Sequence, residues 1–456
     1  MLSVEVTSHE TIKPSSPTPA DLRSMPLSVI DQLCPDMYVQ VLLFFRAAGA
    51  VPPAAKAALL KSSLAKTLTH FYPLAGRLSS SGSELLRADH AHVDCNDAGV
   101  EFYEATVEGG RRLLEAVLGR PPMRELCKLM PDVGANIKPG GPLLAVQLNA
   151  FPCGGVALGV CVSHRVADAT SLALFLNSWG EMGRVPGLIS SPPRYHAASL
   201  FPPRDLLWAP VPQTARGSLP ERFVIRGPEV GKLRQETAYA GRTQPPTRFE
   251  AVATLLWRCI IRARRKVAAA GGGGGNRSSG KRRRTHVALF LVNLRKRMAG
   301  ELSDASFGNL VAYALVAADG SAAEDGPGED LLLQASMEGS MRKAVRSVDV
   351  DYVREKLEAF LSPQHGEEEG DVVVDGMEIS SWCRISLYRT DFGWGEPAWL
   401  CSPMRDLVNV AVLGDTKDGL GVEAWVWLPE PEMEMLVREP ELLEFVDPQS
   451  ISYHTP

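Results

Sequence analysis

Residues 156–179 read VALGVCVSHRVADATSLALFLNSW, and this stretch decides the fold class. Residues 155–162 form a continuous apolar run that predicts a buried strand, and the apolar residues of 169–182 recur on one face of a helix. His164 and Asp168 lie in the short connection between the two elements. Strands that alternate with amphipathic helices are typical of mixed α/β proteins.

The flanking sequence continues this alternation. Residues 143–150 are expected to pair with 155–162 as a hairpin, and residues 84–94 with 100–105 as another. Thr247 and Glu250 match a capping box and predict the start of a long helix. Further elements are predicted as a helix at 52–71 and strands at 37–46, 286–294, 310–317, 379–388, 408–413 and 422–428.

The length of 456 residues predicts two domains, because single hydrophobic cores stop growing at about 250–300 residues. A proline-rich stretch between Gly183 and Glu221 excludes long helices and marks a crossover. We therefore expect an N-terminal domain over 1–200, a linker over 201–221 and a C-terminal domain over 222–456. A glycine-rich insert at 271–280 has a composition that is not expected to fold.

Composition excludes several function classes. The net charge of −5 gives no overall positive field for nucleic acid. The eight cysteines form no C-x-x-C pair, so neither a zinc site nor a redox motif is indicated, and reduced thiols in the cytoplasm are the expectation. The N-terminus lacks the pattern of a secretory signal, and no apolar run is long enough to predict a membrane span.

A His-x-x-x-Asp spacing occurs twice, and the spacing alone is a weak signal. His90 and Asp94 fall within a predicted strand beside a polar turn, where a solvated sheet face explains them. His164 and Asp168 instead follow a buried strand, a position where a rigid element holds a residue that a loop leaves accessible. If these residues had no catalytic role, His164 would be a hydrogen-bonded polar residue at the end of a strand, and Asp168 would be the N-cap of the following helix.

Two signatures together resemble one enzyme family. SHRVADATSL, residues 163–172, resembles the HxxxD signature of the BAHD family of plant acyl-CoA-dependent acyltransferases, and residues 391–395 match its DFGWG motif in full. The resemblance covers nearly the whole chain. It is closest to the branch of alkaloid and terpenoid acetyltransferases that contains vinorine synthase. Further stretches similar to the family are PSSPTP (14–19), LTHFYPLAGRL (68–78), FGN (307–309), SSWCR (380–384) and DTKDGLGVEAW (415–425).

The resemblance implies a fold and a reaction. The fold would be two domains like chloramphenicol acetyltransferase, each a mixed sheet with helices, with the active-site channel at their interface. The reaction would move an acyl group, with acetyl favoured, from acyl-CoA to a hydroxyl of a plant specialised metabolite without a covalent intermediate. Acyl-CoA would be a co-substrate, and no metal or bound prosthetic group is implied. The expected partners are acyl-CoA and a small acceptor, not nucleic acid or a membrane, and a monomer is expected.

The resemblance also assigns residues. His164 would be the general base, and Asp168 would be structural and paired with Arg295, although a catalytic dyad of His164 and Asp168 remains an alternative. Asn309 and Asp415 are candidates for lining the channel and binding CoA. A structural loop near the CoA entrance would contain Asp391, Gly393, Trp394 and Gly395.

The sequence leaves three questions open. The acyl group could be hydroxycinnamoyl or benzoyl, and the acceptor an amine. The chain could also be a catalytically silent relative with a binding or regulatory role, although both intact signatures argue against this. Finally, Ala169 replaces the glycine usual after the signature Asp; alanine suits a helical position, but a positive φ there would be strained.

Overall fold

The structure is a computed structural model of the whole chain. The residues it describes are 2–47, 51–79, 92–110, 113–119, 123–134, 137, 140–204, 218, 220–238, 245–271, 283–319, 329–361 and 372–451. The chain forms two compact units. The first comprises Met1–Pro212, Ala299–Leu310 and Ile385–Arg405, and the second comprises Gln213–Met298, Val311–Arg384 and Asp406–Pro456.

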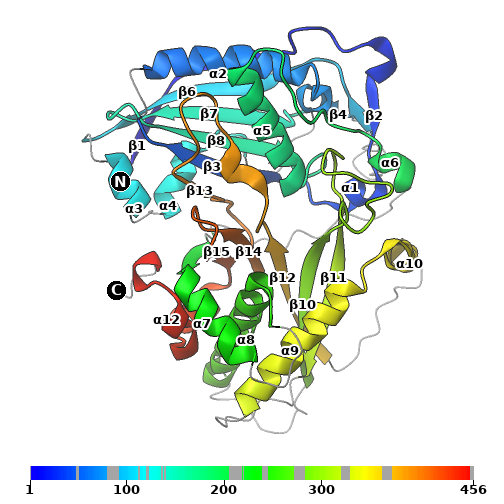
Figure 1. Cartoon of the computed structure of the whole chain (residues 1–456), viewed down its shortest axis with the longest axis vertical. Helices are drawn as coiled ribbons and strands as arrows, with labels where there is room; N and C mark the ends of the chain where they lie inside the picture. Colours follow the sequence, from blue (N-terminus) through cyan, green and yellow to red (C-terminus); the bar gives the residue numbers. More distant parts are fainter. Residues whose placement is uncertain are drawn as a thin grey trace. The chain divides into compact units, whose positions relative to one another are not determined.

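The first unit is built on a six-stranded mixed sheet, with the order β1-β6-β7-β8-β3-β13 (Figure 1). Strands β6 and β7 are parallel, and the other neighbours are antiparallel. All residues of β8 are buried, as its continuous apolar sequence predicts. The strands are β1 (Ser3–Ile12), β3 (Tyr38–Phe45), β6 (Val100–Glu108), β7 (Leu144–Ala150), β8 (Val156–Ser163) and β13 (Trp399–Cys401).

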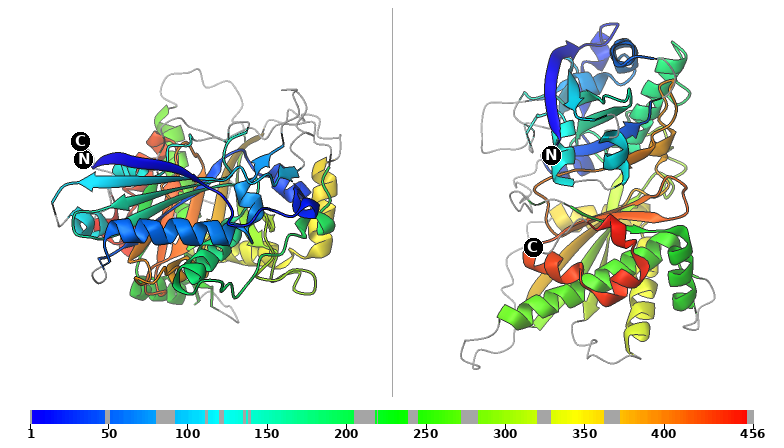
Figure 2. Two further views of the ribbon diagram at one scale, coloured as in Figure 1. Left: turned by 90° about the horizontal axis from the view of Figure 1, so that it is seen from above. Right: turned by 90° about the vertical axis from the view of Figure 1, so that its left-hand side faces the viewer.

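Helices α2 (Pro53–Leu68) and α5 (Ala169–Arg184) pack against each other on one face of this sheet (Figure 2). Trp179 of α5 is fully buried between them, and its indole N–H is within hydrogen-bond distance of the Ser63 hydroxyl at 3.0 Å. The remaining elements of this unit are α1 (Val29–Leu33), α3 (Leu113–Gly119), α4 (Met123–Leu126), α6 (Ala197–Leu200) and a small sheet of β2 (Ser24–Pro26), β5 (His92–Asp94) and β4 (Arg77–Leu78).

The second unit has its own six-stranded mixed sheet, with the order β11-β10-β12-β14-β15-β9. Its longest helix, α8 (Arg248–Gly271), packs on strands β12 and β15 and is flanked by α7, α9 and α11. The other elements are β9 (Glu221–Ile225), α7 (Gly227–Ala238), β10 (Arg283–Asn293), β11 (Val311–Asp319), α9 (Glu329–Arg346), α10 (Val350–Leu361), β12 (Val372–Ser381), β14 (Val410–Asp415), β15 (Val422–Trp427), α11 (Glu430–Leu436) and α12 (Pro440–Phe445).

The predicted fold class, mixed α/β with a sheet and helices in each of two parts, is confirmed. The hairpin around Gly154 is also confirmed, because β7 and β8 pair antiparallel from Leu144↔Val162 to Ala150↔Val156. The predicted capping box of α8 is present: the Thr247 N–H donates to the Glu250 carboxylate at 2.8 Å, and the Glu250 N–H donates to the Thr247 hydroxyl at 3.2 Å.

Two strand predictions were wrong. The hairpin of 84–94 with 100–105 does not form in the described part, because β5 pairs with β2 and β4 whereas β6 pairs with β1 and β7. The strand predicted at 379–388 is observed earlier in the chain, as β12 (Val372–Ser381). Residues Ser386–Arg389 form a 3₁₀ turn. Alternating polarity indicates a strand but not its partner, so long-range pairing decided both cases.

The compact units do not follow the sequence in the simple order of the expected domains. Segments Ala299–Leu310 and Ile385–Arg405, which come after the expected linker, belong to the first unit. The DFGWG loop is therefore part of the same unit as His164. Most of the linker at 201–221, and the insert beyond Gly271, lie outside the described residues.

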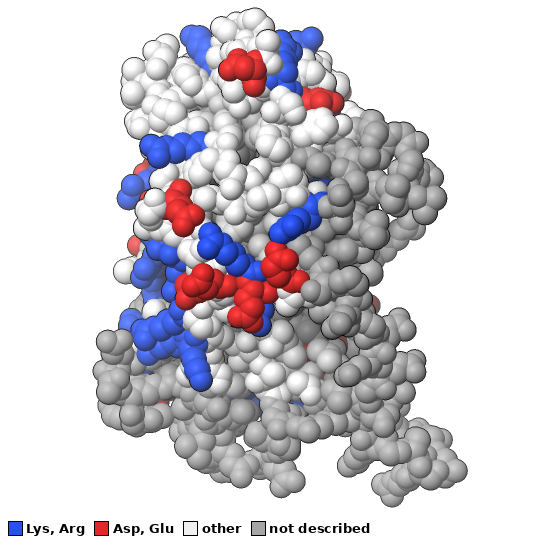
Figure 3. All heavy atoms as spheres, turned by 90° about the vertical axis from the view of Figure 1, so that its right-hand side faces the viewer, with Lys and Arg blue, Asp and Glu red and all other residues white. Residues whose placement is uncertain are grey.

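Surface charge is mixed on the face that Figure 3 shows, where Lys and Arg side chains lie next to Asp and Glu. This pattern agrees with the small net charge of −5. Among the helices of the described ranges, none has the length and apolarity needed to cross a membrane.

Candidate active site

His164 is held at the exit of β8. Its backbone N–H donates to the Met37 carbonyl at 2.9 Å, which continues the pairing of β3 with β8 by one residue. The flanking Ser163 and Arg165 are buried, whereas His164 keeps part of its surface exposed. A rigid sheet therefore fixes the backbone of a residue that keeps part of its surface exposed.

One ring nitrogen of His164 has a hydrogen-bond partner. Its Nδ1 lies 3.1 Å from the Oδ1 atom of Asn309. Burial lowers the pKa of the imidazole below its usual value of 6.5, although a hydrogen bond to its own backbone and the nearby charges of Asp168 and Asp31 act in the opposite direction. The net shift favours a neutral ring at neutral pH, which is the form that accepts a proton.

Asn309 is fully buried, and its side chain bridges the His164 loop to helix α1. Its Nδ2 donates to the His164 carbonyl at 2.6 Å and to Asp31 Oδ1 at 2.9 Å. These contacts direct its amide toward the histidine loop, and the expected role of Asn309 in lining the channel and binding CoA stays a prediction.

Asp31 is a site residue that the sequence analysis missed. It is the N3 residue of a capping box in which the Ser28 N–H and hydroxyl donate to Oδ2 at 2.9 and 2.7 Å. The backbone N–H of Asn309 donates to the other oxygen, Oδ1, at 2.8 Å. Burial raises the pKa of Asp31 despite these hydrogen bonds. The Ser28-x-x-Asp31 spacing indicates a helix start, but no local signal identifies Asn309 as the distant partner.

Asp168 caps helix α5 and also holds the segment that contains Asn309. Its Oδ1 accepts the N–H of Ser171 at 2.8 Å, and its Oδ2 accepts the N–H of Leu310 at 3.1 Å. Ala169 is the first residue of α5, so the position needs only a helical conformation and alanine suits it.

Arg295, the expected partner of Asp168, is buried after β10 in the second unit. Its backbone N–H donates to the Asn293 side chain at 3.0 Å. The pairing of Asp168 with Arg295 stays a prediction.

The DFGWG segment forms a tight loop in the first unit. Asp391 Oδ1 accepts the backbone N–H groups of Gly393 and Gly395 at 2.8 and 2.9 Å. Both glycines have positive φ, 102° and 96°, which side chains with a Cβ rarely adopt. The guanidinium of Arg184, at the end of α5, donates to the Asp391 carbonyl. The sequence of the motif therefore matches the backbone that it forms.

Aromatic packing anchors this loop to the helices beside it. Phe392 and Trp394 stack with ring centroids 5.4 Å apart, and Phe392 meets Trp179 edge-on at 5.0 Å. Lys56 of α2 is buried, and its ammonium lies 5.6 Å from the centroid of the Trp394 ring. The loop is thus packed against both helices.

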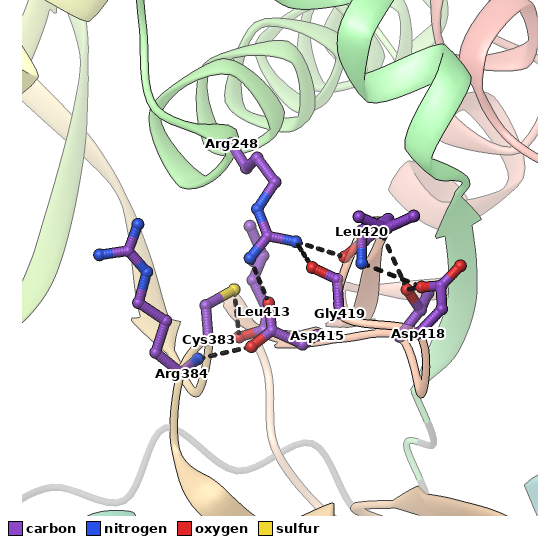
Figure 4. A network of polar contacts seen from close by, with 10 residues as sticks. Arg248, Cys383, Arg384, Leu413, Asp415, Asp418, Gly419 and Leu420 are labelled. Carbon is purple, nitrogen blue, oxygen red and sulfur yellow. Dashed lines mark hydrogen bonds and ion pairs between the residues drawn. The ribbon is translucent and has the colours of Figure 1, made fainter.

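Asp415 belongs to a polar network in the second unit (Figure 4). Its Oδ1 accepts from Arg248 Nη2 at 2.9 Å, and its Oδ2 accepts the backbone N–H of Arg384 at 2.6 Å. Arg384 follows β12 with a φ of 65°, and its guanidinium points away from the network. Asp415 joins the start of α8 to the ends of β12 and β14, and its expected role in binding CoA stays a prediction.

The second His-x-x-x-Asp match is only partly visible. His90 lies outside the described residues, and Asp94 lies in β5 with a half-exposed side chain, 3.2 Å from the imidazole of His92. Trp382, which directly follows β12, is buried.

Comparisons with known proteins agree with these motifs. The model of the Transferase family matches residues 2–443. Limonoid 21-O-acetyltransferase from Melia azedarach is 34% identical over 98% of this chain and 99% of its own length. Salutaridinol 7-O-acetyltransferase from Papaver somniferum is 32% identical over 97% of this chain and 98% of its own.

Vinorine synthase from Rauvolfia serpentina is 34% identical over 97% of this chain and 98% of its own. A crystal structure of vinorine synthase matches 98% of this chain and 100% of its own, with a TM-score of 0.79 and 33% identity. The match extends across both units, so it is not limited to one motif. The chain therefore belongs to the Transferase family, the BAHD acyltransferases.

Proposed function

We propose that this protein transfers an acyl group, acetyl in the first instance, from acyl-CoA to a hydroxyl of a small plant metabolite, with His164 as general base. The observation that carries the proposal is a partly exposed histidine, fixed at the end of a buried strand, whose imidazole has a lowered pKa. The named activities of the relatives, O-acetyl transfer to a limonoid and to salutaridinol, support acetyl transfer to oxygen.

The chemistry needs one base. A thioester carbonyl is already reactive, whereas an alcohol is almost fully protonated at neutral pH and is a poor nucleophile. A neutral His164 removes the hydroxyl proton as the oxygen attacks the carbonyl carbon. The carbon–oxygen bond forms, the carbon–sulfur bond breaks, and the imidazolium returns its proton to the leaving CoA thiolate. The ring is then neutral again.

Other site residues are assigned supporting roles in this proposal. Asp168 acts as a scaffold, because its two oxygens are used by backbone N–H groups of Ser171 and Leu310. Asp391, Gly393, Trp394 and Gly395 form a structural loop, because their contacts are with one another, with neighbouring helices and with Phe45 of β3. A monomer in the cytoplasm that needs no bound prosthetic group remains our prediction.

The test is the His164→Ala variant, assayed for release of free CoA thiol with acetyl-CoA and a panel of plant alcohols and amines. Loss of a general base should lower kcat by about 10²–10⁴-fold without unfolding the protein. The matched control is the double variant His90→Ala/Asp94→Ala, which removes the other copy of the same spacing. It should keep kcat within about threefold, because we assign this copy no role in the reaction.

Each other result has a clear meaning. An active His164→Ala enzyme would refute the base assignment. Transfer with hydroxycinnamoyl-CoA or benzoyl-CoA, or to an amine, would correct the donor or acceptor within the same chemistry. No thiol release with any pair, in a folded protein that still binds CoA, would favour the silent relative.

A further inference from the structure

The side-chain amide of Asn309 has one orientation that satisfies its neighbours. The atom assigned as Nδ2 faces two acceptors, the His164 carbonyl at 2.6 Å and the Asp31 carboxylate at 2.9 Å. Exchanging Oδ1 and Nδ2 would place the amide oxygen against both acceptors and remove two hydrogen bonds. The oxygen of the amide must therefore point at the third neighbour, the His164 ring, at 3.1 Å.

An amide oxygen can only accept, so the ring nitrogen that faces it has to donate. That nitrogen is Nδ1 of His164. A neutral imidazole has one N–H and one lone pair, so a proton on Nδ1 leaves the lone pair on Nε2.

We propose that Asn309 is a positioning residue that fixes the tautomer of His164, so that Nε2 is the nitrogen that takes the acceptor proton. The role of His164 as a base rests on the proposed function. Its tautomer does not, because it is a property of the protein without substrate. Asn309 does not need to touch either substrate. It acts by holding both ends of His164, the ring and the backbone carbonyl.

Asp31 explains why the amide of Asn309 does not rotate. The carboxylate accepts four hydrogen bonds, two from Asn309 through its backbone N–H and Nδ2, and two from Ser28. A buried carboxylate that is fully hydrogen-bonded on both oxygens is a rigid partner. Its charge also polarises the amide, which makes the Asn309 oxygen a better acceptor for the His164 ring.

Gly308 allows the backbone to present Asn309 in this way. It has a φ of 130°, and a Cβ there would lie 3.4 Å from the Cβ of Ala197. The Ser171 hydroxyl, at the start of α5, lies within hydrogen-bond distance of both the Gly308 carbonyl (2.9 Å) and its N–H (3.1 Å). Together with the bond from Leu310 to Asp168, these contacts fix the segment on both sides of Asn309.

A neutral amide suits a base better than a carboxylate in the same place would. During transfer the ring becomes positive, and its Nδ1–H keeps donating to Asn309, so no hydrogen bond is lost. A carboxylate partner would hold the proton more strongly by stabilising the charged ring, and return of the proton to the thiolate would be harder. The arrangement therefore orients the ring, and the Asn309 hydrogen bond raises the pKa of the imidazole without the further rise that a negative charge in its place would bring.

The direct test reads the tautomer without any substrate. Protein labelled with ¹⁵N-histidine is studied by long-range ¹H–¹⁵N NMR at a pH above the titration of its histidines, and the His164 signals are assigned by their loss in His164→Ala. The expected result for the wild type is a protonated Nδ1 and an unprotonated Nε2. A protonated Nε2 in the wild type would overturn the proposal, whether or not a transfer activity is ever found.

The second measurement uses Asn309→Ala. It should produce a mixture of tautomers and lower kcat by about 10- to 100-fold, the size of effect expected when a catalytic group is mispositioned. The KM for acetyl-CoA should change by less than about threefold, because both amide atoms of Asn309 are engaged with His164 and Asp31. The control is Asn177→Ala, which removes another hydrogen-bonded asparagine of the first unit, on α5, and should leave the His164 signals and kcat unchanged.

These results separate two failures. If the wild-type tautomer is as expected but His164→Ala remains active, the proposed function fails and the tautomer assignment stands. If His164→Ala is inactive while Asn309→Ala keeps both the tautomer and kcat of the wild type, Asn309 has no positioning role.

Discussion

Asp168 accepts the backbone N–H of Leu310, 142 residues later in the chain, at 3.1 Å. The carboxylate thereby joins the loop that contains His164 to the segment that contains Asn309, while its other oxygen caps α5. The second residue of the HxxxD signature therefore holds backbone on both sides of the site.

Replacing this carboxylate by an amide should destabilise the protein. In Asp168→Asn, one position now occupied by an acceptor becomes an NH₂ group that faces a backbone N–H, either of Leu310 or of Ser171. A buried donor left unsatisfied costs about 1–3 kcal/mol, so thermal unfolding should occur at a lower temperature and activity should fall with it. A variant with unchanged melting temperature but reduced kcat would instead support a catalytic dyad of His164 and Asp168.

The pH dependence of the reaction should reflect the lowered pKa of His164. A base must be neutral to act, so kcat/KM falls as the pH drops through the pKa of the imidazole. Because burial places that pKa below 6.5, against the opposing charges of Asp168 and Asp31, activity should be retained as the pH falls to 6.5 and lost only below it. Melting temperatures over the same range provide the control. An acidic limb above pH 6.5 in a folded enzyme would contradict the burial effect.

The strained backbone at Arg384 makes a separate prediction in the second unit. Its φ of 65° is unfavourable for an arginine, and its bond to Asp415 uses only the backbone N–H. Arg384→Gly should therefore keep that bond and change stability by no more than about 1 kcal/mol, in the stabilising direction if the strain exceeds the added chain entropy.

The matched variant at the other side of the network should behave differently. Arg248→Ala removes the charge-assisted bond to Asp415 and should destabilise by about 1–3 kcal/mol. Chemical denaturation of both variants gives the comparison. Strong destabilisation by Arg384→Gly would mean that its side chain has a role that the contacts do not show.

Local sequence predicted the elements around His164 well, because strand β8 and helix α5 have clear periodicity and the signature lies between them. It could not predict the contacts of Asn309, because its partner Asp31 is 278 residues away and becomes a neighbour only through folding. For the same reason β6 was paired with the wrong strand: the true partners, β1 and β7, are set by tertiary packing. The tight loop after Asp391 was easier to predict, because the glycines that follow this residue suit the turn that they form.

The contact between Gly180 and Asp391 gives the last prediction. A Cβ added at Gly180, in the middle of α5, would lie 2.6 Å from the Asp391 carbonyl oxygen, which is closer than atoms tolerate. Alanine favours a helix over glycine by about 1 kcal/mol, but this gain cannot offset forcing the DFGWG loop away from the helix. Overpacking of this kind typically costs about 1–3 kcal/mol, so Gly180→Ala should lower the melting temperature.

Gly183, one turn later in the same helix, is the matched control. A Cβ there would approach the Ser63 hydroxyl and the Phe392 ring at 3.6 and 3.7 Å, which are ordinary contact distances. Gly183→Ala has the same helical gain without the clash, so it should be neutral or stabilising by up to about 1 kcal/mol. The difference between the two variants in thermal unfolding isolates the close approach of α5 to Asp391. Equal melting temperatures would show that the loop yields freely and is not held against the helix.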